Sequence, residues 1–185
     1  MAIEIEKKYR LTRELWEQLP ARLQEAGAAR EGEEFEENTL YAGPGLDPRR
    51  RVLRLRRAGE RAVFTFKERD LSGSAVKRQR EEETEVSDGA ALAAILDALG
   101  YRPSLVYEKR RATWRLAGAE VVLDELPFGL FAEIEGGEEE IREAERLLGL
   151  EAAEAEHAPY PELTLRHGVE RDGVVAARFT PDESR

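Results

Sequence analysis

The chain has 185 residues, no cysteine and a formal net charge of -10, with an isoelectric point near 5.0. The lack of cysteine excludes a disulfide framework, a thiolate metal site and a thiol nucleophile. The acidity argues against nucleic acid or an anionic membrane as a partner, because those surfaces attract basic proteins. The first residues lack the pattern of a signal peptide, and no apolar run approaches the roughly 20 residues that span a bilayer. We therefore expect a soluble, cytoplasmic protein.

Alternating apolar and charged residues predict that the chain consists mainly of β-strands. The alternation begins in "IEIEKKYR", residues 3–10, and recurs between turn signals such as "RAGE" and "LAGAE". The predicted strands lie at 3–10, 35–42, 51–58, 61–69, 75–86, 105–116, 119–125 and 130–135.

Three helices are predicted between these strands. The first follows Thr12 as its N-cap and stops at Gly27. The second spans about 88–99, and the third lies between Gly137 and Gly149.

Runs of strands at short spacing with few helices favour an antiparallel barrel or sandwich over a βαβ fold. We find no interdomain linker and expect one domain over residues 1–165. Residues 166–185 are polar and have no clear period, so we expect a loosely held C-terminal tail.

Charged side chains occupy one face of each predicted strand in turn. In the first strand, Glu4, Glu6 and Lys8 share the face opposite Ile5 and Tyr9. The bases at equivalent positions elsewhere are Arg54, Arg56, Lys67, Lys77, Lys109 and Arg111. The acids are Glu81, Glu83, Glu85, Asp124, Glu133 and Glu135. A solvated face would explain one such strand, but the repetition favours a shared site.

If the sheet closes into a barrel, these charged side chains line its lumen and the apolar faces meet helices outside. Burying so many ions is costly unless they are paired or bind ligands. Mg²⁺ and Mn²⁺ prefer carboxylate oxygens, and phosphates prefer Arg and Lys. The pattern therefore suits a metal-bound polyphosphate.

Several segments also resemble, in the same order, the blocks of the CYTH superfamily of triphosphate tunnel metalloenzymes. "EIEKK" resembles its Glu-x-Glu-x-Lys signature, and the resemblance covers about residues 3–165. The other matching segments are "VLRLRR", "FTFK", "REEETEV", "EKRRATWRL", "VVLDELPFGLFAEIEG" and "YPEL". The resemblance implies an α+β, mainly β fold: an eight-stranded antiparallel closed barrel, or tunnel, with helices packed outside. It also implies that the tunnel holds a triphosphate and requires a divalent metal, Mg²⁺ or Mn²⁺.

The resemblance assigns roles to the charged residues. The expected metal ligands are Glu4, Glu6, Glu133 and Glu135, with Glu83 and either Glu81 or Asp124 supporting a second metal. The expected triphosphate clamp is Lys8, Arg54, Arg56, Lys67, Lys109 and Arg111. Glu4, Glu6 and Lys8 are the catalytic candidates, and Lys8 would orient or activate the attacking water. A bulge within 75–86 would instead turn Arg78 or Arg80 inward.

The remaining candidate residues are expected to be structural. His157 and His167 have no partner at triad or metal-ligand spacing, and Trp16 and Trp114 have apolar neighbours. The sequence contains no Walker-type glycine loop and no nucleophile elbow.

We therefore expect a metal-dependent enzyme that hydrolyses tripolyphosphate or an organic triphosphate such as thiamine triphosphate. The alternative is a class IV adenylate cyclase, which converts ATP to cyclic AMP and pyrophosphate. A sensor without turnover would need fewer acids, and a lipocalin-like carrier would have an apolar lumen. The expected partner is a small triphosphate molecule rather than nucleic acid or a membrane, and assembly as a homodimer is left open.

Overall fold

The computed structural model describes residues 5–48, 50–69 and 79–180. The chain divides into two compact units, which are described separately. Unit 1 comprises residues 1–35 and 109–159, and unit 2 comprises residues 36–108 and 160–185. The long strands β2 (Ala29–Ala42) and β6 (Arg102–Leu116) contribute residues to both units. None of the helices in the described part of the chain is long and apolar enough to cross a membrane.

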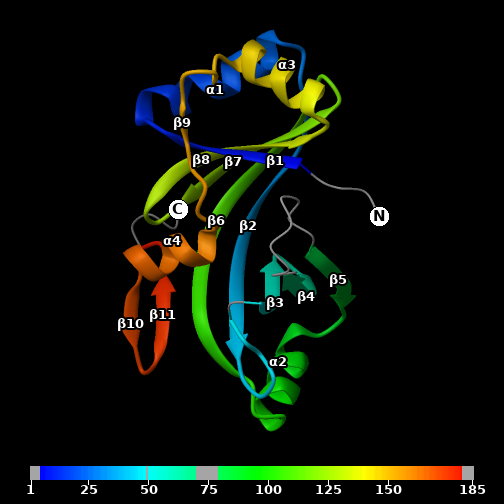
Figure 1. Ribbon diagram of the computed structural model, residues 1–185, viewed down its shortest axis with the longest axis vertical. Coiled ribbons are helices and arrows are strands. Elements are labelled where there is room, and N and C mark those ends of the chain that lie inside the picture. Colours follow the sequence, from blue (N-terminus) through cyan, green and yellow to red (C-terminus); the bar gives the residue numbers. More distant parts are fainter. Residues whose placement is uncertain (1–4, 49, 70–78, 181–185) are drawn as a thin grey trace. The chain divides into compact units, whose positions relative to one another are not determined.

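Figure 1 shows the remaining elements in chain order. Unit 1 adds β1 (Ile5–Leu11), α1 (Arg13–Glu25), β7 (Ala119–Leu126), β8 (Gly129–Gly136), α3 (Glu138–Leu148) and β9 (Glu154–Ala155). Unit 2 adds β3 (Arg51–Ala58), β4 (Arg61–Arg69), β5 (Gln79–Val86), α2 (Gly89–Ala98), α4 (Tyr160–His167), β10 (Val169–Arg171) and β11 (Val174–Ala177).

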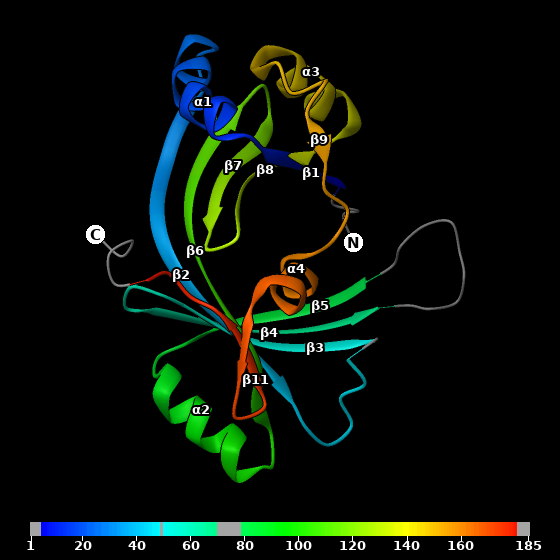
Figure 2. The same cartoon turned by 90° about the vertical axis from the view of Figure 1, so that its left-hand side faces the viewer.

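In unit 1, an antiparallel sheet carries two helices on one face (Figures 1 and 2). The strand order is β6-β7-β8-β1-β9, and α1 and α3 pack against each other and against β8. Leu19 and Leu23 of α1 and Ile141 of α3 are buried in the core together with Tyr9 of β1. Because side chains alternate along a strand, the residues next to Tyr9 in sequence point to the other face.

The predicted ends of two helices in unit 1 are confirmed. The hydroxyl of Thr12 accepts a hydrogen bond of 3.2 Å from the backbone N–H of Leu15, as an N-cap does. Gly149 ends α3 with a φ of 66°, a left-handed conformation that glycine adopts without steric cost.

In unit 2, the antiparallel order is β5-β4-β3-β2, and α2 packs against β3. Leu53 and Leu55 of β3 and Leu96 of α2 lie in the core of this unit. The charged residues of β3 alternate with these leucines and therefore occupy the opposite face of the strand.

The mainly β, antiparallel α+β architecture was predicted, but closure of the sheet was not found. Within the described residues the strand order begins at β5 and stops at β9, so hydrogen bonds do not complete the expected eight-stranded ring. The sheet has 11 strands in total, because β9, β10 and β11 add short pieces that are too brief to show a period. Residues 3, 4 and 75–78 of the predicted strands lie outside the described residues.

The expectation of a loosely held segment after residue 165 is wrong for residues 169–177. These residues form a hairpin of β10 and β11, and β11 pairs in parallel with β6 through Val175 and Leu105. Its Ala177 is buried, whereas Val169 is exposed. The polar composition hid these strands because a short strand joined to a sheet edge needs few apolar residues.

Candidate active site

The charged face of unit 1 begins with Glu6 and Lys8 on β1. The register places Glu6 opposite Glu135 and Lys8 opposite Glu133 on β8. On the other face of β1, Lys7 is bonded to Glu145 of α3. The predicted division of "IEIEKKYR" into two faces therefore holds for the described residues 5–10.

Ion pairs link the charged face of β1 to β8. Lys8 Nζ lies 3.2 Å from Glu133 Oε1 and donates a 3.3 Å hydrogen bond to the carbonyl oxygen of Ala158. The opposite oxygen of the same carboxylate, Glu133 Oε2, accepts a 2.7 Å hydrogen bond from Arg111 Nη2 on β6. Glu133 is therefore held between two bases from different strands.

Asp124 on β7 is a fully buried carboxylate with two basic partners. Arg111 donates to it from Nε at 2.7 Å and from Nη2 at 2.5 Å, a bidentate arrangement. The Nζ of Lys109, itself 3% exposed, lies 3.5 Å from Asp124 Oδ2. In this structure Asp124 acts as an ion-pair partner that orients Arg111.

The carboxylate of Glu6 lies close to other acids. Burial raises the pKa of Glu6, and repulsion from Glu133 and Glu135 raises it further. Lys8 and Arg111 oppose this rise without cancelling it. A cation bound here would relieve the repulsion, and carboxylate oxygens are the ligands that Mg²⁺ and Mn²⁺ prefer. The donor set therefore fits a hard divalent metal.

A complete metal cluster is not assembled by the described residues. They contain no group of three His, Cys, Asp or Glu side chains spaced to hold an ion. Glu4, one of the expected ligands, lies outside the described residues. Glu133 faces Lys8 and Arg111, so metal binding here requires its carboxylate to exchange basic partners for the ion.

The basic face of unit 2 lies on β3 and β4. Arg54 Nη2 donates a 3.2 Å hydrogen bond to Thr65 Oγ1, and that hydroxyl donates a 3.0 Å hydrogen bond to Glu83 Oε2. Lys67 Nζ lies 2.8 Å from Glu81 Oε2. The ladder of β4 and β5 is continuous, with Thr65 opposite Glu83 and Lys67 opposite Glu81. The expected alternation is therefore kept over residues 79–86.

The alternative register for this strand is not found. Arg80 is 67% exposed and pairs with Glu82 on its own strand, so it lies on the face opposite Glu81 and Glu83. Lys77 and Arg78 lie outside the described residues.

Two guanidinium groups in unit 2 keep nitrogen atoms without partners. The Nε of Arg54 is buried and has no hydrogen-bond partner among the residues that the structure describes. Arg56 donates only from Nε, to Asn38 Oδ1 at 3.3 Å, and this Nε lies 3.4 Å from Glu36 Oε2. Within the described part of the chain, Nη1 and Nη2 of Arg56 make no hydrogen bond or ion pair. This pair of nitrogens matches the geometry of a phosphate or carboxylate.

The sequence matches the family model of the CYTH domain over residues 2–159. The chain belongs to the CYTH domain family. A search of the curated proteins found no match.

Solved structures share the architecture of this CYTH domain. The PH1012 protein of Pyrococcus horikoshii OT3 is 26% identical, with a TM-score of 0.71 over 87% of this chain and 99% of that one. A candidate adenylate cyclase of Vibrio parahaemolyticus is 24% identical, with a TM-score of 0.64 over 86% and 96% of the chains. The Hippeastrum protein HpAC1, a candidate adenylyl cyclase with a dominant triphosphatase activity, is 20% identical, with a TM-score of 0.63 over 84% and 91%. These similarities confirm the predicted fold class, the α+β tunnel class of this family.

Analysis of the sequence missed the buried polar layer of the CYTH domain in unit 2. Glu36 and Asn38 on β2 are both fully buried, and Tyr107 on β6 is 4% exposed. Burial raises the pKa of Tyr107, and the neighbouring Arg54 only partly offsets the rise. A signal was present, because Glu36 and Asn38 follow the same two-residue spacing as the other charged faces.

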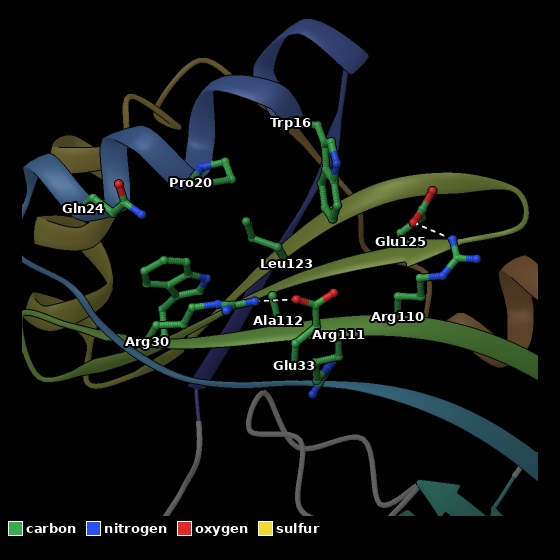
Figure 3. Close-up of a pocket in the computed structure, with 11 residues that line it drawn as sticks. Trp16, Pro20, Gln24, Arg30, Glu33, Arg110, Arg111, Ala112, Leu123 and Glu125 are labelled. Carbon is green, nitrogen blue, oxygen red and sulfur yellow. Dashed lines mark hydrogen bonds and ion pairs between the residues drawn. The ribbon is translucent and has the colours of Figure 1, made fainter. Parts of the chain in front are cut away.

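A pocket of about 330 Å³ lies beside α1 on the helix-covered side of unit 1 (Figure 3). Its walls include Trp16, Leu123 and Trp114, which are core residues as predicted. Its charged groups are already paired, Arg30 with Glu33 and Arg110 with Glu125. Of the predicted site residues only Arg111 reaches the pocket, so we do not place the reaction there.

Proposed function

We propose that this CYTH domain is a divalent-metal-dependent triphosphatase. Its proposed substrate is inorganic tripolyphosphate or an organic triphosphate such as thiamine triphosphate. The observation that carries the proposal is the Arg56 guanidinium, whose two terminal nitrogens have no partner within the described residues. It stands beside Arg54 on β3, in a chain whose other unit crowds Glu6 with two further carboxylates. Such a chain offers donors for a polyanion and oxygens for its counter-cation.

The basic residues of β3 and β4 bind the substrate in this proposal. Arg54 and Arg56 donate to the phosphate oxygens, and Lys67 adds a third positive charge. Guanidinium contacts to these oxygens strengthen as negative charge shifts during transfer, so the arginines assist the reaction as well as binding. Lys67 must leave Glu81, which it contacts at 2.8 Å.

The acidic residues of unit 1 serve the metal. Glu6, Glu133 and Glu135, with Glu4, would hold Mg²⁺ or Mn²⁺, which supplies charge neutralisation and Lewis acidity. Lys8, anchored to Glu133 at 3.2 Å and to the carbonyl of Ala158, orients the attacking water. Lys109 and Arg111 complete the substrate clamp, and Asp124 keeps Arg111 in place through two hydrogen bonds.

Adenylate cyclisation is the second candidate function. The Vibrio parahaemolyticus and Hippeastrum proteins carry that assignment as candidates, and the second has a dominant triphosphatase activity. A cyclase needs the same polyphosphate donors but directs the ribose 3′ hydroxyl of ATP at the α-phosphorus, and pyrophosphate leaves. The described residues include no aromatic pocket with free polar groups for a nucleobase beside Arg54 or Arg56, which favours the hydrolase.

One assay separates the two functions. The purified full chain is incubated with Mg²⁺ or Mn²⁺ and with tripolyphosphate, thiamine triphosphate or ATP, and the products are identified. We expect inorganic phosphate, with no turnover after exhaustive chelation of the metal. Cyclic AMP and pyrophosphate from ATP would establish the cyclase instead. A preparation of the Glu6→Gln variant controls for contaminating phosphatases.

A further inference from the structure

Arg56 on β3 is held from one side only. Its Nε donates to Asn38 Oδ1 at 3.3 Å and lies 3.4 Å from Glu36 Oε2, both on the neighbouring strand β2. The side chain of Arg56 is 25% exposed, whereas that of Glu36 is fully buried. The contacts thus lie at the buried end of the guanidinium, and its exposed end carries Nη1 and Nη2.

Asn38 and Glu36 are themselves joined. Asn38 Nδ2 donates a 3.1 Å hydrogen bond to Glu36 Oε2, while its Oδ1 accepts from Arg56. The two ends of the amide therefore have different obligatory partners, a carboxylate that only accepts and a guanidinium that only donates. This arrangement fixes the orientation of the Asn38 side chain and, through it, the plane of the Arg56 guanidinium.

The network differs from an ordinary stabilising ion pair. Arg111 places both Nε and Nη2 on the carboxylate of Asp124, which is the geometry expected of a tight pair. Glu36 and Asn38 leave the whole Nη edge of Arg56 without a protein partner among the described residues. Burying a carboxylate is costly, and here it stabilises a cation that remains available to a ligand.

We propose that Glu36 and Asn38 are positioning residues that orient Arg56, so that Nη1 and Nη2 together receive one phosphate group of the substrate. This inference rests on the proposed triphosphatase function. It adds two residues to the site, neither of which touches the substrate. The register supports it, because Asn38 lies directly opposite Arg56 in the ladder between β2 and β3.

The decisive variant is Glu36→Gln, which keeps the shape of the side chain and removes its charge. A hydrogen bond to a charged group contributes enough that we expect kcat/KM for tripolyphosphate to fall about tenfold or more. Asn38→Ala should have a similar effect, and Asn38→Asp, which keeps an oxygen for Nε, should recover part of the activity. The matched control is Glu37→Gln, because Glu37 is adjacent in sequence but pairs with Arg57 and Arg178. It should change kcat/KM less than about twofold.

A double-mutant cycle separates positioning from a general structural role. If Glu36 acts through Arg56, Glu36→Gln should cost almost nothing further in an Arg56→Ala background. An equal loss in both backgrounds would overturn the inference. Thermal melting of each variant shows whether it is folded, and Asn38→Asp serves as the second probe if Glu36→Gln does not fold.

A third measurement does not depend on turnover. The Nε–H of Arg56, assigned in ¹H–¹⁵N spectra through its loss in Arg56→Lys, should be protected from exchange in the parent. It should exchange faster in Glu36→Gln and unchanged in Glu37→Gln. Unaltered protection in Glu36→Gln would also overturn the inference. If protection responds as expected but the parent neither binds nor hydrolyses tripolyphosphate, the proposed function fails, and the network is a structural ion pair.

Discussion

In unit 1, Arg111 donates from two nitrogens to Asp124 and again to Glu133, whereas in unit 2 Arg56 donates from Nε alone. Asp124 and Lys109 are almost completely buried, and Arg56 is a quarter exposed. Both clusters arise from the same alternation of charged and apolar residues along strands. The difference teaches that the pattern alone does not separate a self-neutralised network from a set of donors ready for a ligand.

The largest expected effect concerns the metal in unit 1. Glu6→Gln should lower turnover by at least about 100-fold, because it removes a charged ligand from the proposed metal site. The measurement is phosphate release from tripolyphosphate at saturating Mg²⁺. Glu17→Gln, on the exposed side of α1, is the control and should keep parental activity. Equal losses in both variants would return the charged face of β1 to an ordinary solvated surface.

The free donors of unit 2 should matter for binding and for chemistry. Arg54→Ala and Arg56→Ala should each lower kcat/KM by about 10- to 100-fold, with KM raised and kcat reduced. Both constants are expected to change because the phosphate oxygens gain charge in the transition state. A rise in KM with an unchanged kcat would limit these arginines to ground-state binding.

The saturated network of unit 1 should dominate stability in the metal-free protein. Asp124→Asn leaves Arg111 and Lys109 facing a buried neutral group, and breaking a buried ion pair costs about 3–5 kcal/mol. Urea unfolding measures this change. Glu83→Gln in unit 2 is the contrast, since Glu83 is 47% exposed and lies 3.7 Å from Arg54, so its loss should cost less than about 1 kcal/mol. Similar costs for the two variants would remove the distinction between the units.

Ligands should stabilise the protein through both clusters. At concentrations near 100 times Kd, metal with tripolyphosphate should add about 2.7 kcal/mol to the free energy of unfolding. Glu6→Gln and Arg56→Ala should each gain much less, which differential melting with and without ligand would show. Full stabilisation of Glu6→Gln would argue against its role as a metal ligand.

The smallest expected effect is a pH dependence at the helix-covered face of unit 1. Burial alone would raise the pKa of Glu145, but hydrogen bonds from Tyr9 and Lys7 and the nearby charge of Arg142 hold it below its ordinary value of 4.5. The folded state therefore binds this proton less readily than the unfolded state. Its contribution to stability is present above pH 4.5 and is lost as the pH falls through the lowered pKa.

The comparison for this effect is Glu145→Gln. The difference between its free energy of unfolding and that of the parent should shrink below about pH 4.5, because the parent then loses the same charge. A difference that stays constant from pH 7 to pH 3 would show that the charge of Glu145 does not contribute.

Much of the fold and part of the candidate site could be predicted from local patterns. The two-residue period located the long strands and assigned Lys8, Arg54 and Arg56 to charged faces opposite apolar ones, and the cap residue Thr12 located the start of α1. Alternation and capping depend on residues close in sequence, so they are visible without the structure.

Partner identity depended on the tertiary structure. The sequence by itself determined that Asp124 and Glu36 would lie on strands among other charged residues, because the period of side chains along a strand is a local property. Only the register between strands decided that Asp124 would bind Arg111 and that Glu36 would lie behind Arg56. Cross-strand pairing joins residues far apart in the chain, and the free energy of each charge depends on which neighbours that pairing brings and how much water it excludes.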